Sequence, residues 1–521
     1  MSRIDFRPAV SAALLVAVLA YVGCTKNTPV SPSGRSSPPS APLANFGNPA
    51  AVLIVSGEQE GYMEPCGCSK EQIGGLIRRY DFVERLHNQK WPTVLIELGT
   101  LIKDPAGARG GFEQSKYKFD YSLKALTLLD YDAVALSAQD LKVGVGEALG
   151  LFDNNLDGKK SKIVVANVKP EATYEKMFRT SIVAAAGPVK LGITAVIDPE
   201  TLQKLADSDK DVLLPSIKRP DEVLPGVLAE LATKSDYQVL MVQGSPALAR
   251  RLALAYPAFD VVVATSLAAD PFNHEPDLLN GGKTMLVSIG KKGKYVGVIG
   301  FYPNEPDRMR YQLVTLNGKY DGPGAPMKHL IQDEYRGFLK TARVVETFAR
   351  QNYFNGAPGA VFVGALTCKE CHPKTFEFWS GTNHAEAFNS LLEDPKPNTA
   401  FDAECITCHT TGFEYHSGWR SETDTPHLAG NQCENCHGPA SRHVADPDNT
   451  EFRKRITVTA KQADKNQLCN HCHDEDNSRD FDFREYWDQI SHKSLDKYTD
   501  PRVHRGITPK TAPARSKSSA P

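Results

Sequence analysis

Four copies of one short pattern, Cys-x-x-Cys-His, constrain this chain more than any other feature of its 521 residues. Composition alone predicts about 0.006 such matches in a chain with this many cysteines and histidines. Two thiols three residues apart can add to the two vinyl groups of one porphyrin, and the adjacent imidazole can bind its iron. The pattern therefore predicts four covalently attached haems c. The four copies are Cys368–His372, Cys405–His409, Cys433–His437 and Cys469–His473.

The motifs predict both the attachment residues and one set of iron ligands. The thioether bonds are expected at Cys368, Cys371, Cys405, Cys408, Cys433, Cys436, Cys469 and Cys472. The proximal iron ligands are expected to be His372, His409, His437 and His473. Zinc ribbons are the main alternative because they also use Cys-x-x-Cys pairs, but they need no histidine directly after every second cysteine.

Residues 1–24 have the form of an export signal, which favours haem because c-type haem is attached outside the cytoplasm. An apolar run over residues 9–23 is short for a membrane span and ends in a glycine followed by Cys24. This ending resembles a bacterial lipoprotein signal and implies lipidation of Cys24, although Tyr21 departs from that pattern. A plain secretory signal and an uncleaved anchor are the alternatives.

The Ser- and Pro-rich residues 25–49 have no hydrophobic pattern and are expected to form a flexible tether. Together with the signal, this tether predicts a protein on the periplasmic or cell-surface side of a bacterial membrane, held by a lipid anchor. Lys plus Arg number 60 and Asp plus Glu number 62, so the charge indicates no nucleic-acid partner.

Residues 50–318 alternate between patterns typical of strands and of helices, which predicts an α/β sandwich of at least three layers. The expected strands are Ala51–Ser56, Thr93–Leu98, Asp132–Leu136, Lys162–Ala166, Leu191–Ile197, Tyr237–Gln243, Asp260–Thr265, Met285–Ile289 and Tyr295–Phe301. The expected helices are Ile73–His87, Tyr117–Leu129, Asp221–Thr233 and Pro246–Tyr256.

Three further segments follow this domain. Residues 319–360 are expected to connect two domains, with a helix over 324–352. In residues 361–504 aliphatic side chains are sparse and His, Cys, Asp, Asn and Trp are frequent. Such a segment cannot fold around its own side chains, so a mainly α multihaem cytochrome domain with little regular structure is predicted. Residues 505–521 are basic and polar, and disorder is expected there.

Histidines outside the motifs occur in three distinctive contexts: His384 in FWSGTNHAEAF, His443 in CHGPASRH and His492 in DQISH. These contexts, with the motifs, resemble the cytochrome c554 family over about residues 361–495. The resemblance implies a tetrahaem fold with closely stacked haems, in which these three histidines are distal iron ligands. A surface or core histidine is the alternative in each case.

With four irons and three distal candidates, one iron has no distal histidine. The resemblance implies one five-coordinate haem, whose open iron can bind a small molecule, whereas an iron with two histidines mostly transfers electrons. Sequence does not indicate which haem is open. His416 and His427 are weaker distal candidates, and His471 is poorly placed because it lies between two attachment cysteines.

Residues 51–302 resemble the 5′-nucleotidase branch of the calcineurin-like metallophosphoesterases. The resemblance rests on EPCGCSKEQIGGLIRRY, VLIELGT, YDAVALSAQD and KYVGVIGF. Where that family binds two metal ions, this chain has Glu58-Gln59-Glu60, Gly99-Thr100, Ser137-Ala138-Gln139-Asp140, Gln243 and Ala264-Thr265-Ser266-Leu267.

No family histidine ligand remains at these positions, so hydrolase activity is not expected. Glu58, Glu60 and Asp140 could hold a hard cation, or they could be ordinary polar loop residues.

Cys66 and Cys68 follow the first strand and so are expected near the former active cleft. One interpretation is a redox-active pair, or a metal or thiol site beside the haems. The alternative is a local disulfide or two inert thiols. The resemblance extends to a group of 5′-nucleotidase-like proteins that carry this Glu-Pro-Cys-Gly-Cys stretch, and this favours the redox interpretation.

The leading functional hypothesis is electron transfer between donor and acceptor proteins through four haems. One rival is an oxidoreductase that acts on a small nitrogen or sulfur compound at the open iron, or on a thiol at the cysteine pair. Another is a nucleotide-binding or nucleotide-hydrolysing module, which rests on fold analogy alone.

Overall fold

The computed structural model describes most of the two expected domains. It describes residues 43–65, 72–104, 107–156, 158–160, 162–170, 172–208, 216–271, 273–353, 355–492 and 495. The expected signal with Cys24, the tether up to residue 42, the Cys66/Cys68 pair and the tail from residue 496 lie outside the described residues.

The first sheet has seven strands in the order β15-β14-β1-β2-β3-β4-β6. Strands β1, β2, β3, β4 and β6 run parallel, and β14 and β15 pair antiparallel at one side. The strands are β1 (Ala51–Ser56), β2 (Thr93–Glu97), β3 (Ala133–Ala135), β4 (Lys162–Val164), β6 (Phe178–Arg179), β14 (Tyr295–Phe301) and β15 (Met309–Thr315).

The second sheet has six strands in the order β12-β13-β11-β10-β8-β7, and β5 pairs with β9 in a small ribbon. Its central strands are parallel. The strands are β5 (Val168–Lys169), β7 (Ser181–Ala186), β8 (Val189–Ile197), β9 (Ser216–Ile217), β10 (Tyr237–Gln243), β11 (Val261–Ala264), β12 (Asp277–Leu279) and β13 (Thr284–Ser288).

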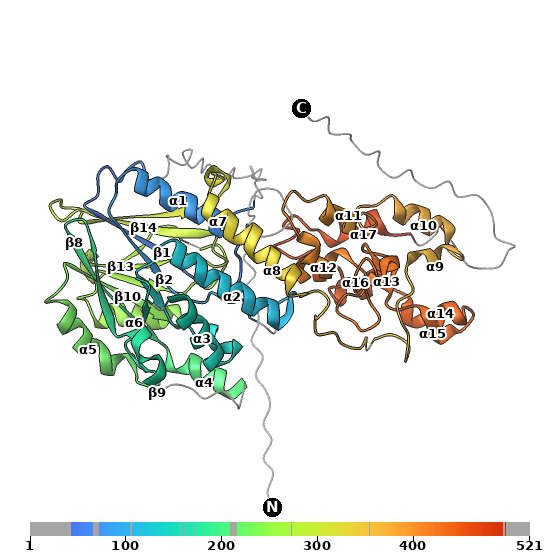
Figure 1. Ribbon diagram of the computed structural model, residues 1–521, viewed down its shortest axis with the longest axis horizontal. Coiled ribbons are helices and arrows are strands. Elements are labelled where there is room, and N and C mark those ends of the chain that lie inside the picture. Colours follow the sequence, from blue (N-terminus) through green and yellow to red (C-terminus); the bar gives the residue numbers. More distant parts are fainter. Residues whose placement is uncertain are drawn as a thin grey trace, which may run out of the picture. The chain divides into compact units, whose positions relative to one another are not determined.

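One hydrophobic core lies between the two sheets, and a second lies between the second sheet and its helices. Along β1, Ala51, Leu53 and Val55 belong to the core between the sheets, whereas Val52 and Ile54 are buried on the opposite face because side chains alternate along a strand. In Figure 1, α1 and α2 lie over the first sheet, and α5 and α6 pack on the second. The α/β sandwich is therefore confirmed.

The four helices expected in this region are present as α1, α2, α5 and α6, and the described residues form further helices that were not expected. Together these helices are α1 (Leu76–Asn88), α2 (Gly111–Leu128), η2 (Asp140–Val143), α3 (Val145–Leu156), η3 (Ala172–Met177), α4 (Pro199–Ser208), α5 (Pro220–Leu231), α6 (Pro246–Ala255), η4 (Asn280–Gly282) and η5 (Gly318–Tyr320).

The connecting helix is shorter than the expected 324–352, so that expectation is wrong at its C-terminal end. The helical path consists of α7 (Ala325–Lys328), a π-helical stretch η6 (His329–Tyr335) and α8 (Arg336–Thr341). Arg343 has a φ of 56°, a left-handed conformation that cannot continue a helix. Turns follow, and Gln351 then forms a β-bridge with Tyr415.

The C-terminal region is mainly helical, as expected. Its helices are α9 (Ala365–Lys369), α10 (Pro373–Ser380), α11 (Ala387–Leu392), η7 (Thr399–Phe401), α12 (Ala403–His409), η8 (Pro426–Leu428), α13 (Cys433–His437), α14 (Ser441–Ala445), α15 (Thr450–Ile456), α16 (Ala460–Lys465), η9 (Cys469–His471) and α17 (Phe483–Ile490).

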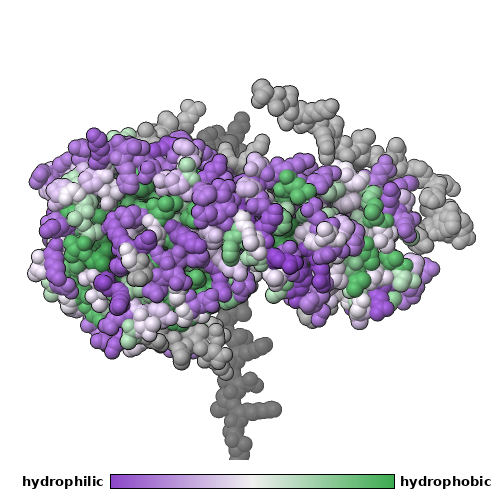
Figure 2. All heavy atoms as spheres, viewed as in Figure 1, coloured by the Kyte–Doolittle hydropathy of each residue, from purple (hydrophilic) through white to green (hydrophobic). Residues whose placement is uncertain are grey.

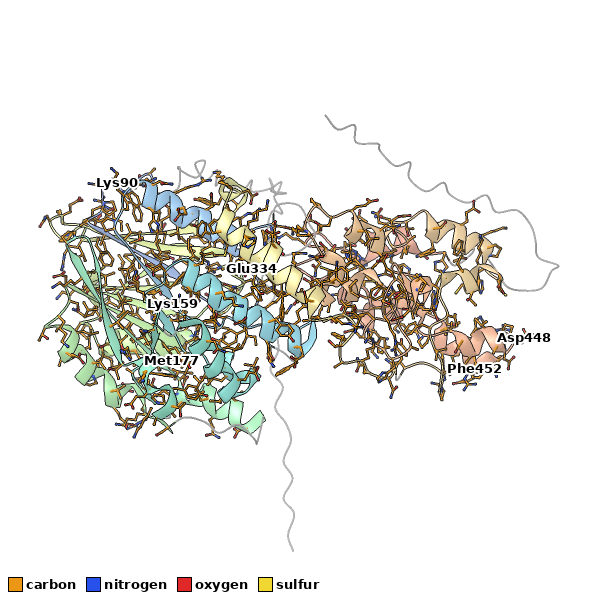
Figure 3. All side chains as sticks on the ribbon, in the orientation of Figure 1. Lys90, Lys159, Met177, Glu334, Asp448 and Phe452 are labelled. Atoms are coloured by element: carbon orange, nitrogen blue, oxygen red, sulfur yellow. The ribbon has the colours of Figure 1, made fainter. Side chains whose placement is uncertain are left out.

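These short helices gain little from packing on the protein chain. Within the described part of this region, α10, α14, α15 and α17 bury no side chain completely. Figure 3 shows Phe452 on α15, and Phe452 is only half-buried. Helices this short are marginal in isolation, so contacts outside each helix must stabilise them.

The surface is mixed in character. Figure 2 shows hydrophobic areas interrupting the hydrophilic surface over both regions. A search of the described residues finds no helix with the length and apolar character that crossing a membrane requires.

Candidate haem-binding site

Each Cys-x-x-Cys-His motif folds into a turn of helix. The second and third motifs form the helices α12 and α13. In the first and fourth motifs, the amide of His372 donates to the Cys368 carbonyl at 2.9 Å, and the amide of His473 donates to the Cys469 carbonyl at 2.8 Å. A helical turn brings side chains three apart to one face, so each pair of thiols can reach one macrocycle.

Two motif histidines are oriented by backbone carbonyls. His409 Nδ1 lies 2.5 Å from the Ala387 oxygen, and His437 Nδ1 lies 2.7 Å from the Ile456 oxygen. A carbonyl can only accept, so Nδ1 carries the proton and Nε2 keeps the lone pair that binds a metal. Both imidazoles are thus held in the tautomer that a proximal iron ligand needs.

Two of the expected distal histidines face motif histidines. The ring centroids of His384 and His473 are 6.1 Å apart, and those of His437 and His492 are 5.9 Å apart. Metal–imidazole bonds of about 2 Å on both sides of one ion give a centroid separation of about 6 Å. These pairs therefore fit one iron between each two rings.

The third distal candidate, His443, lies near His372. Its Nδ1 is buried and has no hydrogen-bond partner among the described residues. A buried polar atom without a partner needs an explanation, and iron ligation supplies one. The three distal candidates thus lie beside the motif histidines of the first, third and fourth motifs, and His409 of the second motif is the remaining position.

The imidazoles of His384, His409 and His437 favour the neutral form. Burial lowers the pKa of His384, and His473 lowers it further. Burial also lowers the pKa of His437, although the Ile456 carbonyl acts in the opposite direction. Burial is again the main cause of the lowered pKa of His409. Only a neutral imidazole can ligate a metal, so this environment suits iron binding.

The motifs lie next to one another in a definite order. The thiols of Cys368 and Cys433 are close enough to influence each other electrostatically, as are those of Cys408 and Cys472. Cys436 and Cys469 lie within electrostatic range of each other. The spatial order of the motifs is therefore first, third, fourth, second.

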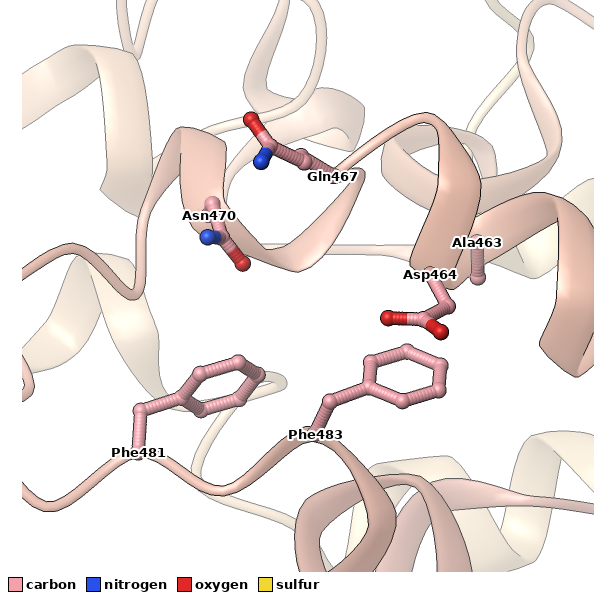
Figure 4. Close-up of a pocket in the computed structure, with 6 residues that line it drawn as sticks. All are labelled: Ala463, Asp464, Gln467, Asn470, Phe481 and Phe483. Carbon is pink, nitrogen blue, oxygen red and sulfur yellow. The ribbon is translucent and has the colours of Figure 1, made fainter.

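A pocket of about 240 Å³ lies beside the fourth motif. Figure 4 shows Phe481 and Phe483 on one side of it and Gln467 and Asn470 on the other. Phe481 stacks on the imidazole of His473, with ring centroids 5.0 Å apart. Flat aromatic walls next to an attachment motif suit contact with a macrocycle.

The α/β region reaches into the second motif through α2. Gln114 Nε2 donates to the Asp402 carboxylate at 2.7 Å, and Gln114 Oε1 accepts from the Ala403 amide at 3.1 Å. Asp402 is the N-cap residue of α12. Lys118, one turn after Gln114 on α2, forms an ion pair with Glu404 in the first turn of α12. The start of the second motif's helix is therefore fixed by the preceding domain.

Contacts of this kind connect positions far apart in sequence and were missed by the sequence analysis. The carbonyl acceptors at Ala387 and Ile456 are backbone atoms, so no side-chain pattern could have revealed them. His471, judged poorly placed as a ligand, forms an ion pair with Glu414 at 3.0 Å.

The polar residues that the resemblance would place at metal positions lie close together and contact one another. Asp140 accepts from the amides of Thr100, Leu101 and Ile102 at 2.8–3.0 Å. Glu58 accepts from the Ser266 amide at 2.6 Å. The Lys291 ammonium lies 3.5 Å from Glu60 and 4.0 Å from Glu58.

Gln243 donates to Thr100 Oγ1 at 3.4 Å and to the Leu98 carbonyl. In the described parts of the chain, no three His, Cys, Asp or Glu side chains converge in a way that could hold a metal ion.

Residues beside the Cys66/Cys68 segment contact the C-terminal region. The Tyr62 hydroxyl donates to Asp476 at 2.5 Å, three residues beyond His473. Glu64 forms an ion pair with Arg336, whose Nη1 also donates to Thr399 at 3.1 Å. Burial alone would raise the pKa of Glu64, but the Arg336 charge holds it below its ordinary value.

The motifs and their paired imidazoles define the class of this region, and a comparison with protein families agrees. The family model described as "Cytochrome c554 and c-prime" matches residues 367–438. This region is therefore similar to c-type cytochromes, which bind haem covalently.

One curated protein is similar to part of this chain. Cytochrome c-554 of Nitrosomonas europaea is 33% identical over 102 residues, which make up 17% of this chain and 43% of that protein. The chain therefore spans less than half of this relative's length.

Two solved structures are similar to part of the chain. The 5′-nucleotidase precursor of Thermus thermophilus has a TM-score of 0.46 and 17% identity, covering 56% of this chain and 59% of its own. The NAD nucleotidase of Haemophilus influenzae has a TM-score of 0.44 and 12% identity, covering 60% and 63%. The chain spans less than two thirds of either protein.

Proposed function

We propose that this protein is an exported c-type cytochrome that moves electrons through four covalently bound haems. The observation that carries the proposal is the pairing of His384 with His473 and of His437 with His492, at centroid separations that suit iron. The domain boundaries proposed with it are 50–318, 319–360 and 361–504.

The haems would supply one-electron exchange between ferric and ferrous iron. The chain's own residues attach, orient and space them. The eight motif cysteines would hold the rings, and the carbonyls of Ala387 and Ile456 accept from Nδ1 of His409 and His437, so that Nε2 of each would be free to bind iron. The motif order first, third, fourth, second supports a continuous path between two ends.

The partners proposed are a redox donor and a redox acceptor protein. The export signal over residues 1–24 and lipidation of Cys24 would place the path on the periplasmic or cell-surface side of a membrane. The α/β domain, in which no histidine stands at the former metal positions, is proposed to support the cytochrome rather than hydrolyse phosphate esters. Nucleotide hydrolysis with added manganese would contradict this.

The proposal is tested by purifying the mature protein from a host that matures cytochromes. Mass spectrometry should show four haems added per chain, and a spectroscopic redox titration should resolve one-electron components that sum to four. A colourless protein with the mass of the bare polypeptide would overturn the proposal.

A second candidate is an oxidoreductase acting on a small nitrogen or sulfur compound at an open haem. The position of His409 favours this candidate. The three distal candidates lie beside the other motif histidines, so an iron bound by His409 would have an open side. Nitric oxide or cyanide should then shift a high-spin signal from one haem in four. If neither ligand shifts the spectrum, electron transfer alone remains.

We propose a redox role for Cys66 and Cys68 because residues that shortly precede them in the chain form contacts near the motifs. Tyr62 contacts Asp476, close to the fourth motif, and Glu64 contacts Arg336, which binds Thr399 before the second motif. A C66S/C68S variant should keep four haems but lose their reduction by added dithiols. Equal rates of reduction in the variant and the natural protein would exclude this role.

A further inference from the structure

Arg109 lies in the short loop before α2, in the α/β region, and hydrogen-bonds to residues inside two haem attachment motifs. Its Nη2 donates to the His471 carbonyl at 2.8 Å, between the two cysteines of the fourth motif. Its own carbonyl accepts from the Thr407 hydroxyl at 3.4 Å, between the two cysteines of the second motif. One residue thus bridges both motifs.

The guanidinium also holds a carboxylate next to an iron ligand. Arg109 Nη2 lies 2.5 Å from Asp474 Oδ2, and Asp474 directly follows His473. The arginine side chain is only 20% exposed, so water screens its charge incompletely. The sulfur atoms of Cys408 and Cys472 also lie within electrostatic range of it.

The loop is built for this close approach. A side chain at Gly110 would meet the Gln114 amide oxygen at 2.7 Å and Glu404 at 3.0 Å. A larger residue at this position would displace the Gln114 side chain, which binds the start of α12. The position of Arg109 follows from packing between the two regions rather than from a mobile surface side chain.

Carboxylates beside the second and fourth motifs are matched by cations from the α/β region. Asp474 pairs with Arg109, Asp476 with Lys292 at 2.5 Å, and Glu404 with Lys118. Removal of one cation leaves a carboxylate uncompensated near the attachment site. A positive charge near a haem favours the ferrous state, which carries one positive charge fewer, and a negative charge favours the ferric state.

We propose that Arg109 sets the reduction potentials of the haems attached at the second and fourth motifs, and thereby makes the α/β region an electrostatic part of the electron path. This inference rests on the proposed function, because it requires haems at both motifs. It assigns the α/β region a role in directing electrons toward the haem pair it contacts.

The test is a spectroscopic redox titration of the full-length haem-loaded protein and its R109Q variant. In R109Q, the midpoint potentials of two of the four components should fall by about 59 mV. For a one-electron couple this is about a tenfold change in the equilibrium constant, in favour of the oxidised state. The other two components should remain where they are. R109K keeps the charge and should recover most of the shift.

A second variant separates electrostatics from structure. D474N removes the carboxylate, while its Oδ1 can still accept from the Asp476 and Asn477 amides. It should raise the potentials of the same two components. R250Q is the matched control, because Arg250 forms an exposed ion pair with Asp277 within the α/β region. It should leave all four components unchanged.

The outcomes distinguish this inference from the proposed function. If haem is absent, the proposed function itself fails. If all variants carry four haems but R109Q leaves every midpoint unchanged, or if D474N shifts them downward like R109Q, then only the role of Arg109 is overturned.

Discussion

The carboxylate of Glu58 lies buried beyond the end of β1, where the Lys291 ammonium is 4.0 Å away. Burial raises the pKa of Glu58 from 4.5 to about 7, despite the hydrogen bond from the Ser266 amide. Glu58 has a φ of 49° and Thr100 a φ of 61°, so strained backbone accompanies this cluster. This buried cluster thus holds a carboxyl group that prefers its proton.

Stability should therefore depend on pH through Glu58. The folded protein binds this proton more tightly than the unfolded chain, so its contribution to stability is full below pH 4.5 and is lost as the pH rises toward 7. E58Q, which is neutral at every pH, should be more stable than the natural protein at pH 8 by roughly 2–3 kcal/mol. Thermal melting at pH 5 and pH 8 measures this.

The control for E58Q is E200Q, a change of an exposed residue on α4. It should alter the melting temperature little at either pH. Equal melting of E58Q and the natural protein at pH 8 would contradict a raised pKa for Glu58.

His384 supplies a second prediction at this scale. H384A should remove the imidazole that faces His473, so one more haem per chain should become high-spin while the haem count stays at four. Absorbance and electron paramagnetic resonance spectra measure this. H416A, a change of an exposed histidine, should leave the spectra unchanged, and an unaltered spectrum in H384A would remove it from the ligand set.

At the scale of elements, the helix of the second motif depends on a neighbour from another region. The carboxylate of its N-cap residue, Asp402, accepts from the Glu404 amide at 2.9 Å and from Gln114 at 2.7 Å. Both Asp402 and Gln114 are buried. The start of α12 is therefore stabilised by tertiary structure rather than by helix propensity.

Q114A should leave the Asp402 carboxylate buried with one hydrogen bond fewer. The expected loss is about 1.5–3 kcal/mol, typical of a hydrogen bond to a charged group. Urea unfolding followed by circular dichroism measures it. Q203A, which removes an exposed hydrogen bond to Asp207 on α4, should cost much less, and a similar loss in both variants would show that Gln114 has no special role.

At the scale of the whole molecule, the order of the motifs predicts how electrons pass. Cys436 and Cys469 link the third motif to the fourth, and Cys408 and Cys472 link the fourth to the second. In the proposed path, a haem at the fourth motif would therefore be interior, and a haem at the second motif would lie at one end.

Removal of the fourth haem in C469A/C472A should interrupt this path, because the second haem then loses its neighbour. Rapid-mixing reduction should become biphasic, with one slow haem among three. In C405A/C408A, which removes the terminal haem, the remaining three should still reduce in one phase. Biphasic reduction in both variants would contradict the proposed order.

The strands show how much of the fold local sequence could predict. β1, β10 and β14 begin and end where their β-branched runs do, because buried strands need continuous apolar sequence. The helix expected over 324–352 ends at Thr341, because Arg343 has a left-handed conformation. The helical spacing of the side chains does not reveal this conformation. Local pattern predicts element type well and element ends poorly.

The Cys-x-x-Cys-His motifs were evident from sequence alone, because attachment chemistry acts within five consecutive residues. Which histidines face each other, as His384 and His473 do, and which motifs are neighbours depend on the tertiary structure. So do the bonds of Arg109 to His471 and Thr407. Contacts between residues far apart in the chain leave no local pattern, and only folding brings their atoms within bonding distance.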